Sequence, residues 1–284
     1  MASAATLFAA PKAFEGHIGM IQRNAITSWC QHRDQVDIFL FGNDPGVAEI
    51  AEEFSIRHFP HVERNDEGTP RLDSIFSQAI EASGSPIMMY VNSDIVFNSS
   101  LPFTLQKIDD LQLDTFLLIG QRTNFDQLEP IPFSEVGWEE KLMARVAREG
   151  KLASILCKDY FVFPREAYRE IPAFAIGRGN WDNWMVAEMA KNNSPVIDVT
   201  ECLFAGHQNH DYTHAGGRMR AYVSGSEARR NKALAGGSNY VSGSVATHRL
   251  PRSGELVRAN RLPLLSFLRD FPRLARLVYS LFRQ

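Results

Sequence analysis

One short stretch, residues 84–97, most constrains how this chain can fold. Gly84-Ser85-Pro86 precedes the apolar run Ile87–Val91, and the polar triplet Asn92-Ser93-Asp94 follows it before the sequence turns apolar again. A short apolar run without alternation is typical of a strand that is covered on both faces. Because burying Asn92 and Asp94 inside a core would be costly, we expect them at the carboxyl end of that strand. In open α/β sheets that edge binds ligands.

Strands and helices alternate through the first hundred residues. The predicted strands are 6–9, 36–41, 56–59 and 87–91, and the predicted helices are 18–29, 47–54 and 69–82. In the third helix Thr69 is the expected N-cap and Pro70 the first helical residue. This order predicts an α/β fold of the Rossmann-like, doubly wound type, with a mostly parallel sheet and right-handed crossovers.

The second half is less regular. Helices are predicted over 101–111, 138–148 and 181–190, and strands over 115–119, 160–163 and 196–199. We therefore divide residues 1–215 into a regular half, 1–100, with a nucleotide-binding type of fold, and an irregular half, 101–215. Residues 216–260 are rich in Gly, Ser, Asn and Arg, which predicts a loop-rich extension with some helix.

Composition narrows the class of protein. The chain of 284 residues has a net charge of -3, which gives no overall attraction to nucleic acid. Its three cysteines are widely spaced and contain no CxxC pair, which favours a reducing compartment over a disulfide framework. We expect no signal peptide and no membrane span, and hence a cytoplasmic protein.

The segment 261–284 differs from the rest because leucines and phenylalanines alternate with arginines. Such a basic amphipathic segment can lie on an anionic membrane surface, which would make the protein peripheral on the inner face of a membrane. The competing interpretation is a terminal helix that packs on the body of the protein.

Two further clusters fall in predicted loops or at helix starts, where binding residues concentrate. In Arg178-Gly179-Asn180-Trp181-Asp182-Asn183-Trp184, Asp182 is either the N-cap of a helix or a general base. The tryptophans, Trp181 and Trp184, offer flat faces for a sugar ring. Arg178 can pair with a phosphate, or it is a plain surface arginine.

The other cluster is Gly206–His214, which holds three of the eight histidines, beside polar residues that include Tyr212. This grouping favours a metal or phosphate site over a structural role. His207 and His210 are the leading candidates, with His214 behind them.

These motifs, in this order, resemble the GT-A-fold glycosyltransferases of the nucleotide-diphospho-sugar transferase superfamily, over about residues 5–215. Asn92-Ser93-Asp94 resembles the DxD motif, and Trp181-Asp182 resembles the later acidic motif that meets the acceptor. A histidine beyond that motif is similar to an additional metal ligand, which favours His207 or His210. Asn43-Asp44 matches a nucleotide contact. One departure is Asn92, which can ligate a metal through its oxygen but brings no charge.

The resemblance implies transfer of a sugar from a nucleotide-diphosphate sugar to an acceptor hydroxyl, in glycan or polysaccharide synthesis, with a glycan or lipid-linked acceptor. It implies Mn²⁺ or Mg²⁺ at the site. The expected roles are metal binding by Asp94, His207 and His210, donor binding by Asn43, Asp44, Asp73, Asn92, Ser93 and Arg178, catalysis by Asp182, and acceptor binding by Trp181, Asn183, Trp184 and Tyr212.

Three alternatives stay open at this point. A metal-dependent hydrolase could use the histidine cluster, and a non-catalytic nucleotide-sugar-binding protein would fit the uncharged Asn92. A nucleotidyltransferase on a related fold is the weakest, because no glycine-rich basic signature follows the first predicted strand.

Overall fold

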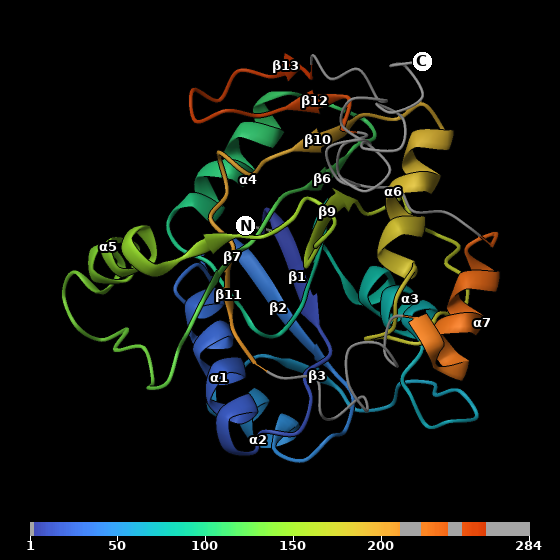
Figure 1. Ribbon diagram of the computed structural model, residues 1–284, viewed down its shortest axis with the longest axis horizontal. Helices are drawn as coiled ribbons and strands as arrows, with labels where there is room; N and C mark the ends of the chain where they lie inside the picture. Colours follow the sequence, from blue (N-terminus) through green and yellow to red (C-terminus); the bar gives the residue numbers. More distant parts are fainter. Residues whose placement is uncertain (1–2, 211–222, 238–245, 260–284) are drawn as a thin grey trace, which may run out of the picture.

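A nine-stranded mixed sheet runs through the molecule, with the order β13-β12-β10-β6-β9-β4-β1-β2-β3 (Figure 1). The computed structural model describes residues 3–210, 223–237 and 246–259. The strands of this sheet are β1 Ala5–Ala9, β2 Val36–Phe41, β3 Arg57–Phe59, β4 Ile87–Val91, β6 Leu117–Ile119, β9 Tyr160–Pro164, β10 Val196–Asp198, β12 His248–Arg249 and β13 Val257–Arg258. The described helices are α1 Gly16–Cys30, α2 Val47–Glu53, α3 Leu72–Ala82, α4 Ser100–Asp110, α5 Trp138–Glu149, α6 Trp181–Lys191 and α7 Ser226–Leu234.

The predicted α/β fold with a mostly parallel sheet is confirmed, and β4 lies near its centre. β1 pairs in parallel with both β2 and β4, and β10 pairs in parallel with β6. β9 is inserted antiparallel between β4 and β6. Because β9 runs the opposite way, the start of β9 lies at the same edge of the sheet as the end of β4.

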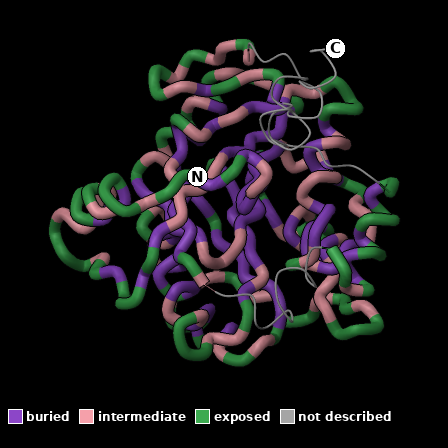
Figure 2. The backbone as a smooth tube through the Cα atoms, viewed as in Figure 1, coloured by how far each residue is buried: buried purple, intermediate pink, exposed green. Residues whose placement is uncertain are grey.

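Helices cover the sheet on both faces, which is why β4 is buried on both (Figures 1 and 2). Met89 and Val91 pack in the core under α1, α2 and α4, whereas Met88 and Tyr90 pack in the core under α3 and α6. Successive side chains of a strand point to opposite faces, so a strand between two helical layers must be apolar throughout. The prediction that Ile87–Val91 is a central strand is thus explained by its surroundings.

A second, smaller sheet has the order β5-β11-β7-β8. Its strands are β5 Ile95–Val96, β7 Thr123–Phe125, β8 Lys151–Leu152 and β11 Gly206–Gln208. β5 follows the polar triplet directly, and β11 pairs antiparallel with it, placing His207 opposite Ile95. The sequence analysis placed the segment of β11 in a loop, and that prediction is wrong because β11 is only three residues long and depends on partners far away in the chain.

One predicted helix start and one candidate N-cap also need correction. α3 begins at Leu72, because the Arg71 N–H donates to Glu63 O and the Leu72 N–H donates to Phe174 O, which keeps Thr69-Pro70 outside the helix in an extended segment. In α6 the N-cap position is Asn180, whose φ of 80° is left-handed, so Asp182 lies in the first turn instead of capping the helix.

The described part of the extension 216–260 contains α7, β12 and β13, and β12 extends the central sheet by pairing with β10. The predicted amphipathic tail, 261–284, lies outside the described residues. Among the described helices, none combines the length and the apolar character needed to cross a bilayer.

Candidate functional site

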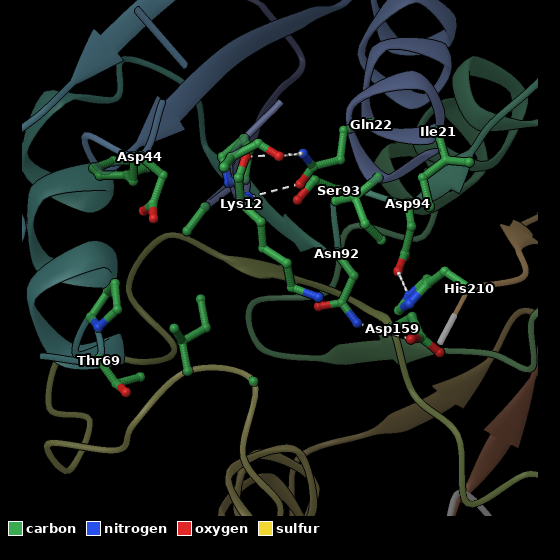
Figure 3. A pocket seen from close by; sticks show the side chains of 18 of the residues that line it. Lys12, Ile21, Gln22, Asp44, Thr69, Asn92, Ser93, Asp94, Asp159 and His210 are labelled. Carbon is green, nitrogen blue, oxygen red and sulfur yellow. Dashed lines mark hydrogen bonds and ion pairs between the residues drawn. The ribbon is translucent and has the colours of Figure 1, made fainter. Parts of the chain in front are cut away.

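A cavity of about 440 Å³ opens at the carboxyl ends of β1, β2, β4 and β6. Its apolar wall includes Ile18, Ile21, Phe41 and Tyr90. The polar side chains that line it are Lys12, Gln22, Asp44, Arg64, Thr69, Asn92, Ser93, Asp94, Arg122, Asp159, Arg178, His207 and His210. Figure 3 shows Asp44 and Thr69 at one end of this cavity and Asp94 and His210 at the other. An apolar cavity with convergent polar groups is the usual form of a small-molecule site.

Asp94 and the two histidines meet although they are remote in sequence. Gln208, between them on β11, is fully buried; its backbone N–H and its Nε2 both donate to Asp94 O, at 3.3 and 3.2 Å. Gln208 Oε1 in turn accepts from Asn24 Nδ2 of α1 at 2.8 Å. These hydrogen bonds fix β11 against the loop after β4 and hold His207 and His210 beside Asp94.

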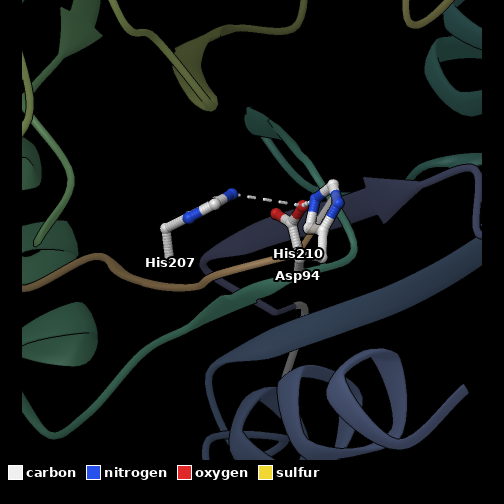
Figure 4. A group of neighbouring side chains, drawn as sticks. All are labelled: Asp94, His207 and His210. Atoms are coloured by element: carbon white, nitrogen blue, oxygen red, sulfur yellow. Dashed lines mark hydrogen bonds and ion pairs between the residues drawn. The ribbon is translucent and has the colours of Figure 1, made fainter. Parts of the chain in front are cut away.

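Asp94 Oδ2 lies 2.9 Å from His210 Nε2 and 3.6 Å from His207 Nε2. Figure 4 shows both imidazole rings turned toward the carboxylate. Burial by itself would raise the pKa of Asp94, but His207, His210 and Arg122 outweigh it and hold that pKa well below its ordinary value. Burial lowers the pKa of His207, with Arg122 adding to the effect while Asp94 opposes it. The ionised form of the Asp94 carboxylate is therefore favoured.

These three side chains fit a divalent cation. One ligand atom from each lies within 4.8 Å of the others. Asp94 Oδ1 is buried and has no hydrogen-bond partner among the described residues. Buried polar atoms without partners are costly, and a bound ion is one of the few groups that can satisfy them. Carboxylate oxygen with imidazole nitrogen suits Mn²⁺ and other first-row ions, and the carboxylate also suits Mg²⁺.

The other two residues of the triplet also line the cavity. Ser93 does so directly, and Asn92 donates through Nδ2 to Asp159 Oδ1 at 2.9 Å. Arg122 Nη1 pairs with the same Asp159 oxygen at 2.5 Å, with both side chains largely buried. No role was predicted for Arg122 or Asp159 from the sequence. Both residues could have been found from their positions beside strands, because Arg122 follows β6 and Asp159 precedes β9. That inference requires knowing that β9 runs antiparallel to β4.

The predicted donor-binding residues divide into two groups. Asp44 and Arg178 line the cavity. Arg64, which also lines it, donates to Asn43 Oδ1 at 2.8 Å and to Asp44 Oδ2 at 3.4 Å. Asp73 is absent from the lining residues and is paired with Arg71 at 2.5 Å. The carboxylate of Asp73 is thus directed at a neighbouring side chain.

The tryptophan-flanked aspartate is placed differently from the expectation. Asp182 is not among the residues that line the cavity, and its Oδ2 lies 3.8 Å from the buried ammonium of Lys158. Lys158 Nζ also donates to Asn183 Oδ1 at 3.1 Å. Asp182 keeps an exposed side-chain fraction of 23%. An acceptor would therefore reach it from outside the described cavity.

Trp181 is a core residue, with 5% of its surface exposed. Its ring packs against Tyr90 and Phe161, with centroids 5.2 and 5.3 Å away. The expectation that Trp181 offers an open face to a sugar does not agree with this packing. Trp184 is half-buried and packs against Phe174 and Tyr168. Tyr212 and His214 lie outside the described residues.

Comparison with solved structures places this arrangement in a known fold. The chain is similar to S. aureus TarS 1–349 in complex with UDP-GlcNAc, with 14% identity, a TM-score of 0.53, and coverage of 81% of this chain and 65% of that one. It is also similar to the same protein in complex with UDP, with 11% identity, a TM-score of 0.50, and coverage of 81% and 64%. The fold is the GT-A fold.

The chain spans less than two thirds of the length of the TarS chains that it matches. Glucosyl-3-phosphoglycerate synthase from Mycobacterium tuberculosis, in complex with Mn²⁺, UDP and phosphoglyceric acid, aligns at 13% identity and a TM-score of 0.49, covering 90% of this chain and 86% of that one. No protein-family model matches the sequence, and no curated protein matches it.

Proposed function

We propose that this protein is a glycosyltransferase that moves a sugar from a nucleotide-diphosphate sugar to an acceptor hydroxyl. The observation that carries the proposal is the cluster of Asp94, His207 and His210 at the carboxyl end of β4, inside a cavity of GT-A type. The Asp94 carboxylate and the two imidazoles would hold a divalent cation, which would supply positive charge to stabilise a diphosphate.

The donor lies along the cavity with its nucleoside near Asp44 and its diphosphate near Asp94, because these residues occupy opposite ends (Figure 3). Hydrogen bonds from Arg64 position Asn43 and Asp44 for the nucleoside. The further proposed donor-binding residues are Asp73, Asn92, Ser93 and Arg178. Mn²⁺ or Mg²⁺ held by Asp94, His207 and His210 supplies stabilisation of the charge that develops on the leaving diphosphate. Lys12, Arg122 and Arg178 add positive charge to the cavity wall.

On the acceptor side, Asp182 is the proposed general base if the reaction inverts the sugar carbon, and it orients the acceptor if the reaction retains it. Its partly exposed carboxylate supports this role, and α6 begins four residues after the cavity-lining Gly177. The proposed acceptor contacts are Asn183, Trp184 and Tyr212. The ring of Trp181 packs against Tyr90, which lines the cavity. A glycan or a lipid-linked glycan is the proposed acceptor, which the basic segment 261–284 would bring to an anionic membrane surface.

The proposal is tested by thermal shift with UDP, GDP and their sugars, with and without Mn²⁺, starting from UDP-GlcNAc. We expect nucleotide protection that depends on the cation, because ligands that bind the native state raise its melting temperature. Asp94→Asn should abolish the Mn²⁺-dependent part. Asp110→Asn is the matched control, since Asp110 is exposed at the end of α4 and does not line the cavity.

Product analysis then separates the function classes. Transfer to an acceptor supports the proposal. Cleavage of the donor pyrophosphate that does not depend on an acceptor would identify a hydrolase. Binding with neither transfer nor donor hydrolysis across an acceptor panel would identify a binding protein.

A further inference from the structure

The cluster that would hold the cation contains a single carboxylate. Asp94 supplies it, whereas the other two members are the imidazoles of His207 and His210, and Asn92 is uncharged. A divalent cation in a buried site is better balanced by two negative groups than by one. Two other carboxylates line the described cavity, and Figure 3 shows that Asp44 lies at its far end. Asp159 is therefore the carboxylate to consider.

Asp159 lies directly beside Asn92, because antiparallel pairing of β4 with β9 sets Val91 opposite Tyr160. The Asn92 N–H donates to Asp159 O at 2.8 Å, and Asn92 Nδ2 donates to Asp159 Oδ1 at 2.9 Å. Arg122 Nη1 donates to that same oxygen. Two donors thus converge on Oδ1 and fix the orientation of the carboxylate.

The second oxygen, Asp159 Oδ2, is buried and has no hydrogen-bond partner among the described residues. The side chain as a whole is 7% exposed. An ionised oxygen that is removed from water without a partner is costly, so such a group points to a positively charged or hydrogen-bonding ligand. Figure 3 shows Asp159 at the end of the cavity that also holds Asp94 and His210.

We propose that Asp159 carries the second negative charge of the cation site. Residue 92 does not supply this charge because it is asparagine. This inference rests on the proposed nucleotide-sugar function and names how its cation is held. The three side chains that would ligate the cation are Asp94, His207 and His210. Asp159 supplies charge near them and is not one of these ligands. An asparagine is required at position 92 for the same reason, since an aspartate there would set two carboxylates side by side.

Arg122 has a defined part in this arrangement. Its guanidinium pairs with Asp159 Oδ1 and, through Nε, donates to Asn124 Oδ1 of β7 at 2.9 Å. It therefore fixes the orientation of the Asp159 carboxylate through Oδ1 and leaves Oδ2 without a hydrogen-bond partner among the described residues.

The test is a calorimetric titration of the full chain with Mn²⁺ alone, on the wild type, Asp159→Asn, the exchange variant Asn92→Asp/Asp159→Asn, and Asp110→Asn as control. We expect Asp159→Asn to raise the Kd for Mn²⁺ by about tenfold or more, as residues that support a metal site do. The exchange variant returns the charge to position 92 and keeps an amide–carboxylate hydrogen bond, so its Kd should return to within about threefold of the wild type. Thermal melts in EDTA verify that each variant is folded.

The outcomes separate this inference from the proposed function. An unchanged Kd in Asp159→Asn, with normal Mn²⁺ binding by the wild type, would overturn the inference alone. A loss of Mn²⁺ affinity in Asp159→Asn that the exchange variant fails to recover would also overturn it. Such a result would indicate a structural role for Asp159, because a structural role is not restored by placing the charge at position 92. A wild type that binds neither Mn²⁺ nor UDP would overturn both.

Discussion

The Arg178 guanidinium and the Glu227 carboxylate form an ion pair, with Nε 2.6 Å from Oε2, that joins the loop before α6 to the first turn of α7. Glu227 also accepts from Asn65 Nδ2 at 2.7 Å, and it is buried. Since Arg178 lines the cavity, a residue of the extension 216–260 holds part of the cavity wall in place.

This pair predicts a pH-dependent stability. Burial raises the pKa of Glu227, but hydrogen bonds from Asn65, Thr69 and Arg178 outweigh it and leave the pKa below its ordinary value. A folded-state pKa below the unfolded one stabilises the protein above the unfolded value, and this contribution is lost as pH falls through the folded value. Urea denaturation should show Glu227→Gln less stable than wild type by about 1–3 kcal/mol at pH 7.

The same comparison repeated at lower pH supplies the check. The difference between wild type and Glu227→Gln should shrink as pH falls below about 4.3, the ordinary value for a glutamate. Glu149→Gln, at the exposed end of α5, serves as control and should change stability little at either pH. A difference that grows on acidification would contradict the assigned sign.

Asp182→Asn tests the acceptor side of the site. The substitution removes a base but keeps the shape of the side chain, and Asp182 does not line the donor cavity. Nucleotide binding should therefore stay within a small factor of wild type, while transfer falls by roughly 10² to 10⁴-fold. The measurements are calorimetry with UDP and Mn²⁺, and product formation with the acceptor that supports turnover. Unchanged turnover would remove Asp182 from the mechanism.

Trp181 should behave as a core residue in a truncation experiment. Replacing it with alanine opens a cavity against Tyr90 and Phe161, and we expect a loss of about 3–5 kcal/mol in the free energy of unfolding. Trp184→Ala should cost less, because Trp184 is only half-buried. Equal and small losses in the free energy of unfolding of both variants would contradict the core position of Trp181.

Gly120, at the end of β6, has no room for a side chain. A Cβ placed there would lie 2.0 Å from Tyr160 Oη, and Tyr160 is fully buried. Gly120→Ala should destabilise the fold by about 1–3 kcal/mol, as overpacking does. Gly84→Ala is the matched control, since a Cβ at Gly84 meets nothing within 4 Å. Equal melting temperatures for the two variants would show that the Tyr160 ring moves aside freely.

Local patterns in the sequence sufficed for the architecture of the first half. The alternation of apolar strands with amphipathic helices predicted β1 to β4 and α1 to α3, since each pattern lies within one element. Asp94 could be placed at the carboxyl end of β4 because the polar triplet that it closes follows the apolar run Ile87–Val91 directly. The histidine cluster was visible for the same reason, since its members lie within a few residues of one another.

Only the tertiary structure decided which groups meet. Asp94 and His210 are 116 residues apart and come together through the pairing of β11 with β5. Asn92 and Asp159 are neighbours because β9 runs antiparallel to β4, and the composition of an apolar strand does not encode its direction. Trp181 is likewise buried by the rings of Tyr90 and Phe161, which come from other strands. Contacts of this kind depend on the summed packing of the whole chain, so no local pattern contains them.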